Sequence, residues 1–359
     1  MHRLVPTLAI IASLAACGGD DDDGGDGAGG FTDQQIITDF ADQVVIPTYQ
    51  LLDERTAALH DAAQTLADAP TMPNLEAARQ AWVDMREPWE QSEGFLFGPV
   101  SAAGWDPAMD SWPLNKDDLE AVLASDDELT QAYIHNLAET QKGFHTIEYL
   151  LWGETSDKAA GDLSARELEY LVALTEELTV ITGDLVASWT DGVGGDAPYR
   201  EVFTTAGQPD NTAYPSLQSA AQEILVGMSG ICDEVANGKI ADPYDARDPD
   251  LVESQYSFNS LEDFADNVRS VENAYTGDFP AGDSAGRGLD EYVAASNPDL
   301  DTRFRAEIAA AIDALGEIPG PFRDAIADPG NDELIETAQQ AIRTIQATID
   351  GDLSTVVLE

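Results

Sequence analysis

The sequence has few basic residues, few cysteines and no long apolar run after its first residues, and each shortage excludes a class of protein. Lysine and arginine number 17 against 68 aspartates and glutamates, and the formal net charge of −51 excludes nucleic acid as a general partner. Solubility in a salty or cation-rich habitat explains most of this charge, so the acidity alone does not indicate a metal site. Sustained alternating runs of β-branched residues are absent, which argues against a β-sheet protein.

Only two cysteines are present, and the first of them, Cys17, closes an apolar run. The run from Leu4 to Ala16 is too short to span a bilayer as a stable helix. It ends in Leu14-Ala15-Ala16-Cys17, which resembles the lipobox of bacterial lipoproteins. The resemblance implies a signal peptide over residues 1–16 and a lipid on Cys17. The alternative is an ordinary secretory signal with an incidental cysteine.

The residues after Cys17 predict a tether and a location. Residues 17–30 contain almost no apolar side chain, so we expect a flexible acidic tether. Gly18, which stands where an aspartate would favour the inner membrane, resembles the sorting signal of outer-membrane lipoproteins. We therefore expect a cell-envelope protein, anchored to the outer membrane by its lipid and facing the periplasm. Cys232 then has no partner for an intrachain disulfide, and its place on an apolar helix face predicts a buried, inert thiol.

Helical periodicity dominates the rest of the chain. Apolar residues recur at spacings of three and four, as at Leu75, Ala78, Trp82, Met85 and Trp89. Such stripes predict an all-α protein. Helix starts are predicted by two capping boxes, Ser125 with Glu128 and Ser164 with Glu167.

A stretch rich in glycine, proline and aspartate divides the helical pattern in two. We interpret residues 191–216 as a linker between a first helical-bundle half over residues 31–190 and a second over residues 217–359. Each half has four or more helical segments, enough to close a bundle around one core.

The sharpest local feature is Gly143-Phe144-His145-Thr146-Ile147-Glu148. On a helix, His145 and Glu148 stand at i and i+3, so the imidazole and the carboxylate project from the same side. The pair can share a metal ion, or the carboxylate can orient the imidazole. Gly143 would allow another backbone to approach closely. A surface ion pair or a capped helix turn is the alternative for an isolated pair of this kind.

Three further motifs accompany this one in a fixed order. They are Glu93 with Phe97-Gly98-Pro99, Asp110 with Trp112-Pro113, and Glu253-Ser254-Gln255-Tyr256-Ser257-Phe258-Asn259-Ser260. Together with the GxHxxE element at Gly143, His145 and Glu148, they resemble the imelysin family, also called iron-regulated periplasmic proteins. The resemblance extends from about residue 32 to the C-terminus and implies two packed helical-bundle halves with a cleft at their interface.

The resemblance also implies metal binding in iron acquisition, in contact with iron-transport components. The ligands that it implies are Glu93, Asp110, His145 and Glu148. One imidazole with three carboxylates suits iron, with zinc or copper as alternatives, although cuprous copper would prefer sulfur. The competing interpretation is a buried polar network in which Glu93, Asp110 and His145 satisfy one another and Arg86.

Two other functions are open. The imelysin name comes from a described peptidase, but a zinc peptidase needs a second imidazole, and H-E-x-x-H is absent. The remaining candidates, His60 and His135, are poorly placed. The protein could instead be a metal-free scaffold that holds a peptide, glycan or partner protein. Aromatic residues that could line its groove are Trp105, Trp112, Trp152, Tyr256 and Phe258, although Trp152 fits core packing better.

Within such a groove we expect a ligand cleft made by the irregular segments. The cleft residues that we predict are Trp112, Glu253, Tyr256 and Ser257, because they are aromatic or polar and lie outside the regular helical pattern.

Overall fold

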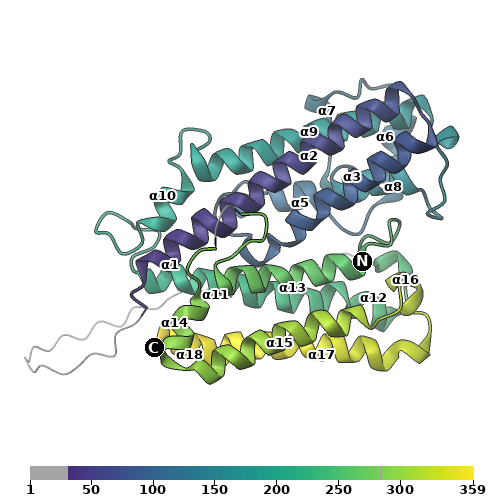
Figure 1. Cartoon of the computed structure of the whole chain (residues 1–359). Coiled ribbons are helices and arrows are strands. Elements are labelled where there is room, and N and C mark those ends of the chain that lie inside the picture. The colour runs from purple at the N-terminus through teal and green to yellow at the C-terminus, as the bar shows by residue number, and fades with distance from the viewer. Residues whose placement is uncertain (1–30, 283–284) are drawn as a thin grey trace, which may run out of the picture.

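A computed structural model describes residues 31–282 and 285–359, and within these ranges every regular element is a helix (Figure 1). The predicted all-α class is therefore confirmed. None of the described helices is both long and apolar enough to cross a bilayer. Cys17, the predicted signal over residues 1–16 and the predicted tether over residues 17–30 lie outside the described residues.

The first half is built around three long helices. Helix α2 packs against both α3 and α9, and the shorter α8 packs on α3 and α9. The long helices are α2 (Ile46–Asp68), α3 (Met72–Glu90) and α9 (Ala165–Thr190). Shorter elements are α1 (Gln34–Asp39), η1 (Phe40–Val45), η2 (Glu93–Phe95), α4 (Pro99–Ala102), α5 (Trp105–Met109), α6 (Lys116–Ala124), α7 (Gln131–His135), η3 (Glu139–Gln141), α8 (Phe144–Trp152) and η4 (Ala160–Asp162).

The second half is a bundle of four main helices that lies beneath the first in Figure 1. These helices are α11 (Leu217–Glu234), α13 (Ser260–Thr276), α15 (Pro298–Gly316) and α17 (Asp332–Thr348). The shorter elements are η5 (Val235–Lys239), α12 (Ala241–Ala246), η6 (Pro249–Leu251), α14 (Leu289–Ser296), α16 (Phe322–Ala325), η7 (Pro329–Asn331), η8 (Ile349–Leu353) and α18 (Ser354–Leu358). Cys232 is buried on α11, as predicted.

Local capping explains one predicted helix start and corrects another. Ser164 accepts a hydrogen bond from the backbone of Glu167, and the Glu167 side chain accepts one from Ser164, so the capping box before α9 is confirmed. The capping box at Ser125 was wrong. Ser125 follows the end of α6, and its hydroxyl donates to the Val122 carbonyl. The next helix, α7, is capped by Thr130 instead.

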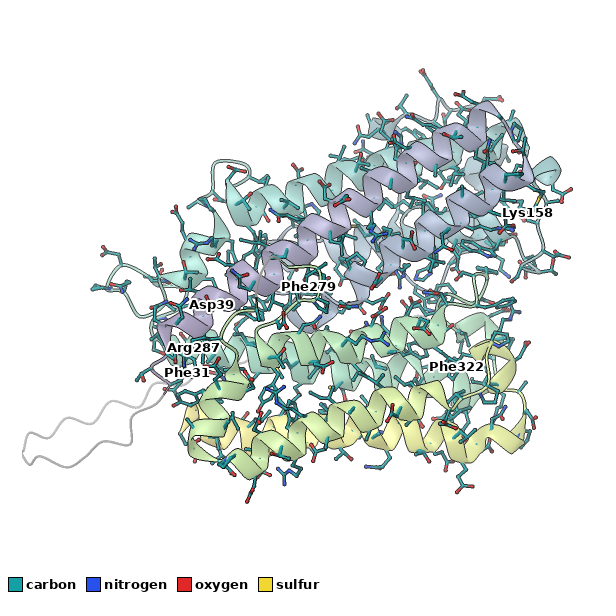
Figure 2. All side chains as sticks on the ribbon, in the orientation of Figure 1. Phe31, Asp39, Lys158, Phe279, Arg287 and Phe322 are labelled. Carbon is teal, nitrogen blue, oxygen red and sulfur yellow. The ribbon has the colours of Figure 1, made fainter. Side chains whose placement is uncertain are left out.

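One segment connects the halves, and a loop of the second half also contacts the first. Residues 191–216 contain a short helix, α10 (Tyr199–Thr204), which packs on α1 and α9. The connection from α13 to α14 returns over the start of the first half, where the Arg287 backbone N–H donates to Asp39 at 2.9 Å and the Arg287 guanidinium pairs with Asp33 at 2.9 Å. Figure 2 shows Asp39 and Arg287 close together at this crossing.

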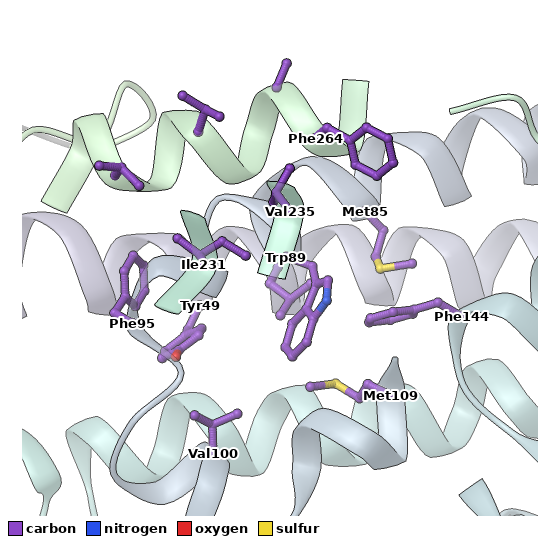
Figure 3. Packing of buried hydrophobic residues seen from close by; sticks show 14 of the residues in the cluster. Tyr49, Met85, Trp89, Phe95, Val100, Met109, Phe144, Ile231, Val235 and Phe264 are labelled. Atoms are coloured by element: carbon purple, nitrogen blue, oxygen red, sulfur yellow. The ribbon is translucent and has the colours of Figure 1, made fainter. Parts of the chain in front are cut away.

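The interface between the halves has an apolar core. Trp89 and Phe95 of the first half face Ile231, Val235 and Phe264 of the second (Figure 3). At one point the backbones nearly touch, because a Cβ on Gly227 would lie 2.3 Å from the Gly94 carbonyl oxygen. Side chains larger than hydrogen would separate the halves there.

An acidic groove runs along the interface between α3 and α13. Asp266 lies in its wall, 7% exposed, where its Oδ1 accepts hydrogen bonds from Gln91 at 2.7 Å and Arg269 at 2.9 Å. Burial raises the pKa of Asp266 to about 6, although Arg269 opposes the shift.

The raised pKa of Asp266 predicts a pH-dependent stability. Between pH 4 and 6 the folded state holds a proton that the unfolded state releases, so the free energy of unfolding falls as pH rises through about 6. Between pH 5 and pH 7, we expect the free energy of unfolding of Asp266→Asn to decrease by about 1–2 kcal/mol less than that of wild type. Urea unfolding at pH 5 and pH 7 measures it, with Asp84→Asn on the same groove as control. Equal pH dependence in wild type and Asp266→Asn would contradict the assignment.

Candidate functional site

Beside the apolar core, the interface holds a buried cluster of charged side chains. Its first-half members come from α3, from η2, from the loop that follows α5 and from α8. Its second-half members come from η5, from residues 252–259 and from α13. Neither half contains the cluster on its own.

Arg86 lies at the centre of the cluster, with no exposed side-chain surface. Its guanidinium donates to Asp110 Oδ1 at 2.8 Å and to Glu253 Oε1 at 2.8 Å, and it also pairs with Glu90 one helical turn later. Burial alone would lower the pKa of Arg86, but Asp110 and Glu90 raise it well above its ordinary value. Arg86 therefore stays charged and fixes carboxylates from both halves.

Gly143 brings the start of α8 against the backbone before Asp110. Its φ is +85°, and a Cβ there would lie 2.2 Å from the Met109 carbonyl oxygen. Only glycine fits this close approach. The predicted role of Gly143 is thus confirmed, and its consequence is that His145 faces Asp110.

His145 is 1% exposed and has an acidic neighbour at each ring nitrogen. Nδ1 lies 3.2 Å from Glu148 Oε2, whereas Nε2 lies 2.9 Å from Asp110 Oδ1 and 3.7 Å from Glu253 Oε1. Burial acts to lower the pKa of His145, but the three carboxylates raise it well above its ordinary value. The Trp112 ring covers the imidazole, with the centroids 4.6 Å apart.

Glu148 is fixed by a turn of the second half. Its Oε1 accepts hydrogen bonds from the Tyr256 N–H at 2.9 Å, the Ser257 N–H at 2.7 Å and the Ser257 hydroxyl at 2.8 Å. Ser254 and Phe258 flank these donors in left-handed conformations, with φ of +50° and +65°. Side chains other than glycine adopt this conformation at a cost, and the carboxylate stabilises it here. Glu148 therefore positions His145 and links the halves.

Asp110, His145 and Glu253 form the arrangement best suited to a metal ion. One ligand atom from each lies within 4.8 Å of the other two. Ligand bonds of about 2.1 Å place neighbouring ligand atoms about 3–4 Å apart. The distances from His145 Nε2 to Asp110 and Glu253, 2.9 Å and 3.7 Å, fit this range. Among the described residues, His145 Nε2 makes no hydrogen bond of good geometry, although it forms an ion pair with Asp110 Oδ1 at 2.9 Å. This nitrogen can act as a ligand once the imidazole gives up its proton, and an entering cation would favour that loss.

The same carboxylates are strongly acidic. Burial would raise the pKa of Asp110, but Arg86 and His145 hold it well below its ordinary range. For Glu253, burial is likewise outweighed, and Lys239 with His145 lowers its pKa to about 2. Both ligand carboxylates are therefore ionised, as metal ligands must be.

Glu93, a predicted ligand, lies in an adjoining group. Its Oε2 contacts Lys239 Nζ at 2.7 Å and accepts a hydrogen bond from Asn267, which also donates to Glu90 at 2.6 Å. Burial raises the pKa of Glu93 to about 8, although Lys239 opposes the shift. The structure thus brings Asp110, His145 and Glu148 into contact and places Glu93 with Lys239 instead.

The predicted cleft residues lie around this cluster in different ways. The Trp112 indole donates to the Leu251 carbonyl at 3.1 Å, and Tyr256 is 1% exposed. Glu253 belongs with the metal-ligand group, and Ser257 with Glu148. A neighbouring surface pocket is lined by Pro113, Asn115, Leu251, Gln255 and Tyr256. The ligand cleft itself stays a prediction.

The predicted groove aromatics have separate positions. Trp152 is buried against Trp82, which agrees with core packing. Trp105 lines an apolar pocket near α10, and Phe258 is exposed.

Sequence reasoning missed Lys239, Asp263 and Asn267 as members of the cluster. A signal existed for two of them, since Asp263 and Asn267 stand at i and i+4 on a face of α13 that is otherwise buried. Lys239 gives no such signal, because its partners are more than a hundred residues away or beyond a loop.

The other described histidines lie elsewhere. His60 contacts Thr175 at 2.9 Å, and His135 pairs with Glu177 at 2.9 Å near the surface. Within residues 31–282 and 285–359, His145 is thus the only imidazole of the cluster. A two-imidazole zinc site of the peptidase kind has no support in this arrangement.

Comparison with known proteins agrees with this fold. The family model described as Imelysin matches residues 45–349. Iron-regulated protein A of Synechococcus elongatus is 36% identical over 324 residues, which cover 90% of this chain and 86% of that protein.

Two solved structures extend the likeness. A Parabacteroides distasonis protein described as an iron-regulated protein A precursor superposes with a TM-score of 0.82 at 30% identity, covering 90% of this chain and 94% of the other. An imelysin-like protein from Psychrobacter arcticum 273-4 superposes with a TM-score of 0.71, covering 90% and 95% of the two chains. At 16% identity, that second likeness concerns the fold alone.

Proposed function

The chain belongs to the imelysin family, and we propose that it binds a bare divalent metal ion, preferably iron(II), through Asp110, His145 and Glu253. The observation that carries the proposal is the buried Nε2 of His145, which makes no hydrogen bond of good geometry among the described residues and faces carboxylates from both halves. The iron-regulated relatives support iron as the metal.

The charge balance of the cluster is compatible with a cation as the ligand. The cluster contains two permanent cations, Arg86 and Lys239, and six carboxylates whose side chains are at most 5% exposed. The carboxylates are Glu90, Glu93, Asp110, Glu148, Glu253 and Asp263. In the interpretation as a polar network, protons compensate this excess of acid, since the pKa values of Glu90, Glu93, Asp263 and His145 are all raised. A divalent ion would take the place of some of these protons.

Burial favours a bare ion over a chelate. Asp110, His145 and Glu253 have side chains at most 5% exposed. Side chains that are buried to this degree offer almost no surface to an organic ligand. One nitrogen and two carboxylate ligands suit Fe(II), Mn(II) and Zn(II).

Calorimetric titration tests the proposal. We expect the purified protein, freed of metal with a chelator, to bind one equivalent of Fe(II) under anaerobic conditions, with Mn(II) and Zn(II) competing for the same site. Absence of binding by all three ions would overturn it.

Glu148 allows a test of the positioning role. Replacing it with glutamine leaves the size of the side chain but removes the charge that orients His145 Nδ1, so we expect metal affinity to fall about 10–100-fold. The turn at residues 254–258 also loses a charged acceptor, so the melting temperature should fall. Titration and thermal unfolding measure both effects. Glu154→Gln, at the surface, is the control, and unchanged affinity in Glu148→Gln would contradict the role.

We further propose that the protein works in the cell envelope, held by a lipid on Cys17, in contact with iron-transport components. The lipobox-like sequence supports the anchor. Fractionation of cells that express wild type or Cys17→Ser tests it, and membrane retention of the variant would contradict it.

A further inference from the structure

Lys239 occupies an unusual place for a lysine. Its Nζ lies 2.7 Å from Glu93, 3.2 Å from Glu253 and 3.5 Å from Glu90, and only 9% of its side chain is exposed. It ends η5, a π-helical turn that continues α11. Such turns are rare and frequently occur at functional sites.

Glu253 is shared between this lysine and the metal-ligand group. Its Oε1 lies 3.7 Å from His145 Nε2, and Lys239 Nζ lies 3.4 Å from the same oxygen and 3.2 Å from Oε2. An ammonium group on this carboxylate opposes a divalent cation on the same carboxylate, because like charges repel strongly in a buried site.

We propose that Lys239 is a tethered counter-cation that sets the metal affinity of the site. Its ammonium group shares Glu253 before the ion binds, and it withdraws onto Glu93 and Glu90 when the ion is bound. The inference rests on the proposed function, which supplies the ion and its three ligands.

The contacts of Lys239 mean that its ammonium group would move only a short distance from Glu253 to Glu93 and Glu90. The nearest oxygen to Nζ already belongs to Glu93, which lies outside the ligand group. Asn267 holds Glu93 and Glu90 together by donating to both, so the receiving carboxylates are fixed in advance. Lysine also has a flexible four-carbon stem and a compact charge.

Arg86 cannot act in this way. Its guanidinium is fully buried and bound at the same time to Asp110, Glu90 and Glu253. Of the two permanent cations, Lys239 is therefore the one that can move away from the ligands.

Lys239→Met tests the inference by removing the ammonium group while keeping the length of the stem. We expect it to bind Fe(II) at least about tenfold more tightly than wild type, since the competing charge is gone. Calorimetric titration measures the affinity, and thermal unfolding verifies the fold. If methionine prevents folding, Lys239→Gln serves the same purpose.

Lys158→Met is the matched control. Lys158 is also ion-paired, 2.6 Å from Glu167, with 13% of its side chain exposed. It lies at the far end of the first half in Figure 2, so its removal should leave the affinity for Fe(II) unchanged.

A second variant shows whether Glu93 receives the ammonium group of Lys239 or binds the ion itself. Glu93→Gln should weaken Fe(II) binding in the wild type, because the ammonium group then stays on Glu253. In the Lys239→Met background, the same change should have almost no effect. Equal weakening in both backgrounds would identify Glu93 as a ligand and overturn its role as the receiving carboxylate.

The outcomes distinguish this inference from the proposed function. If wild type binds Fe(II) and Lys239→Met binds it no more tightly, the inference is wrong and the metal site stands. If wild type fails to bind and Lys239→Met binds, the competing role of Lys239 is supported. If neither protein binds, both ideas are wrong.

Discussion

Replacing His145 with alanine is expected to lower the affinity for Fe(II) more than a hundredfold. The imidazole supplies the only nitrogen of the ligand group and lies between carboxylates of both halves. Alanine removes that ligand and leaves Asp110 and Glu253 more strongly paired with Arg86, which competes with the ion. Calorimetric titration of both proteins with Fe(II), Mn(II) and Zn(II) measures the loss.

His135→Ala is the appropriate control for this variant. His135 also pairs with a carboxylate, Glu177 at 2.9 Å, but 66% of its side chain is exposed and it lies outside the cluster. We expect it to bind each ion as wild type does. If His145→Ala bound every ion as tightly as His135→Ala, the metal site would have to be abandoned.

Replacing Arg86 with leucine should reduce the free energy of unfolding by about 3–5 kcal/mol, because the carboxylates around it would be left without their main counter-charge. Glu90 and Asp263, whose pKa values burial already raises well above ordinary, would lose the cation that opposes this rise. The loss should shrink at acidic pH, where the unpaired carboxylates take up protons. Urea unfolding at pH 5 and pH 8, in the presence of chelator, measures it.

Arg303→Leu provides the comparison. Arg303 also pairs with acids, Glu307 and Asp352, but at the surface, where an ion pair contributes little. A loss in Arg86→Leu no greater than in Arg303→Leu would show that the buried network does not stabilise the fold.

The helices could be predicted from the sequence because their signal is local. The spacing of apolar residues predicted the all-α class, and Ser164 with Glu167 predicted the start of α9. Local chemistry failed at Ser125, where the same capping pattern stands at a helix end. A hydroxyl near a helix terminus can serve either end, and only the neighbouring packing decides between them.

The site could be predicted in part. The spacing of His145 and Glu148 on one helix, and the glycine before them, predicted an oriented imidazole near another backbone. Which acidic residue would contact which partner could not be predicted. Glu253, assigned to a cleft, joins the ligand group, while Glu93, assigned as a ligand, contacts Lys239.

These differences arise because the contacts join residues more than a hundred positions apart. Glu253 meets Arg86 across 167 positions and Lys239 meets Glu93 across 146. Such contacts depend on how the two bundles pack against each other, and the periodicity of apolar residues along the chain does not specify that packing.

The distribution of the ligand residues between the halves has a mechanical consequence. Two of the residues that would hold the ion belong to the first half and the third belongs to the second. An ion bound there would link the two bundles reversibly. Its binding free energy would also stabilise the interface between them. Resistance to proteolysis would then rise with metal supply, so the lifetime of the folded chain in the cell would record how much metal had been available.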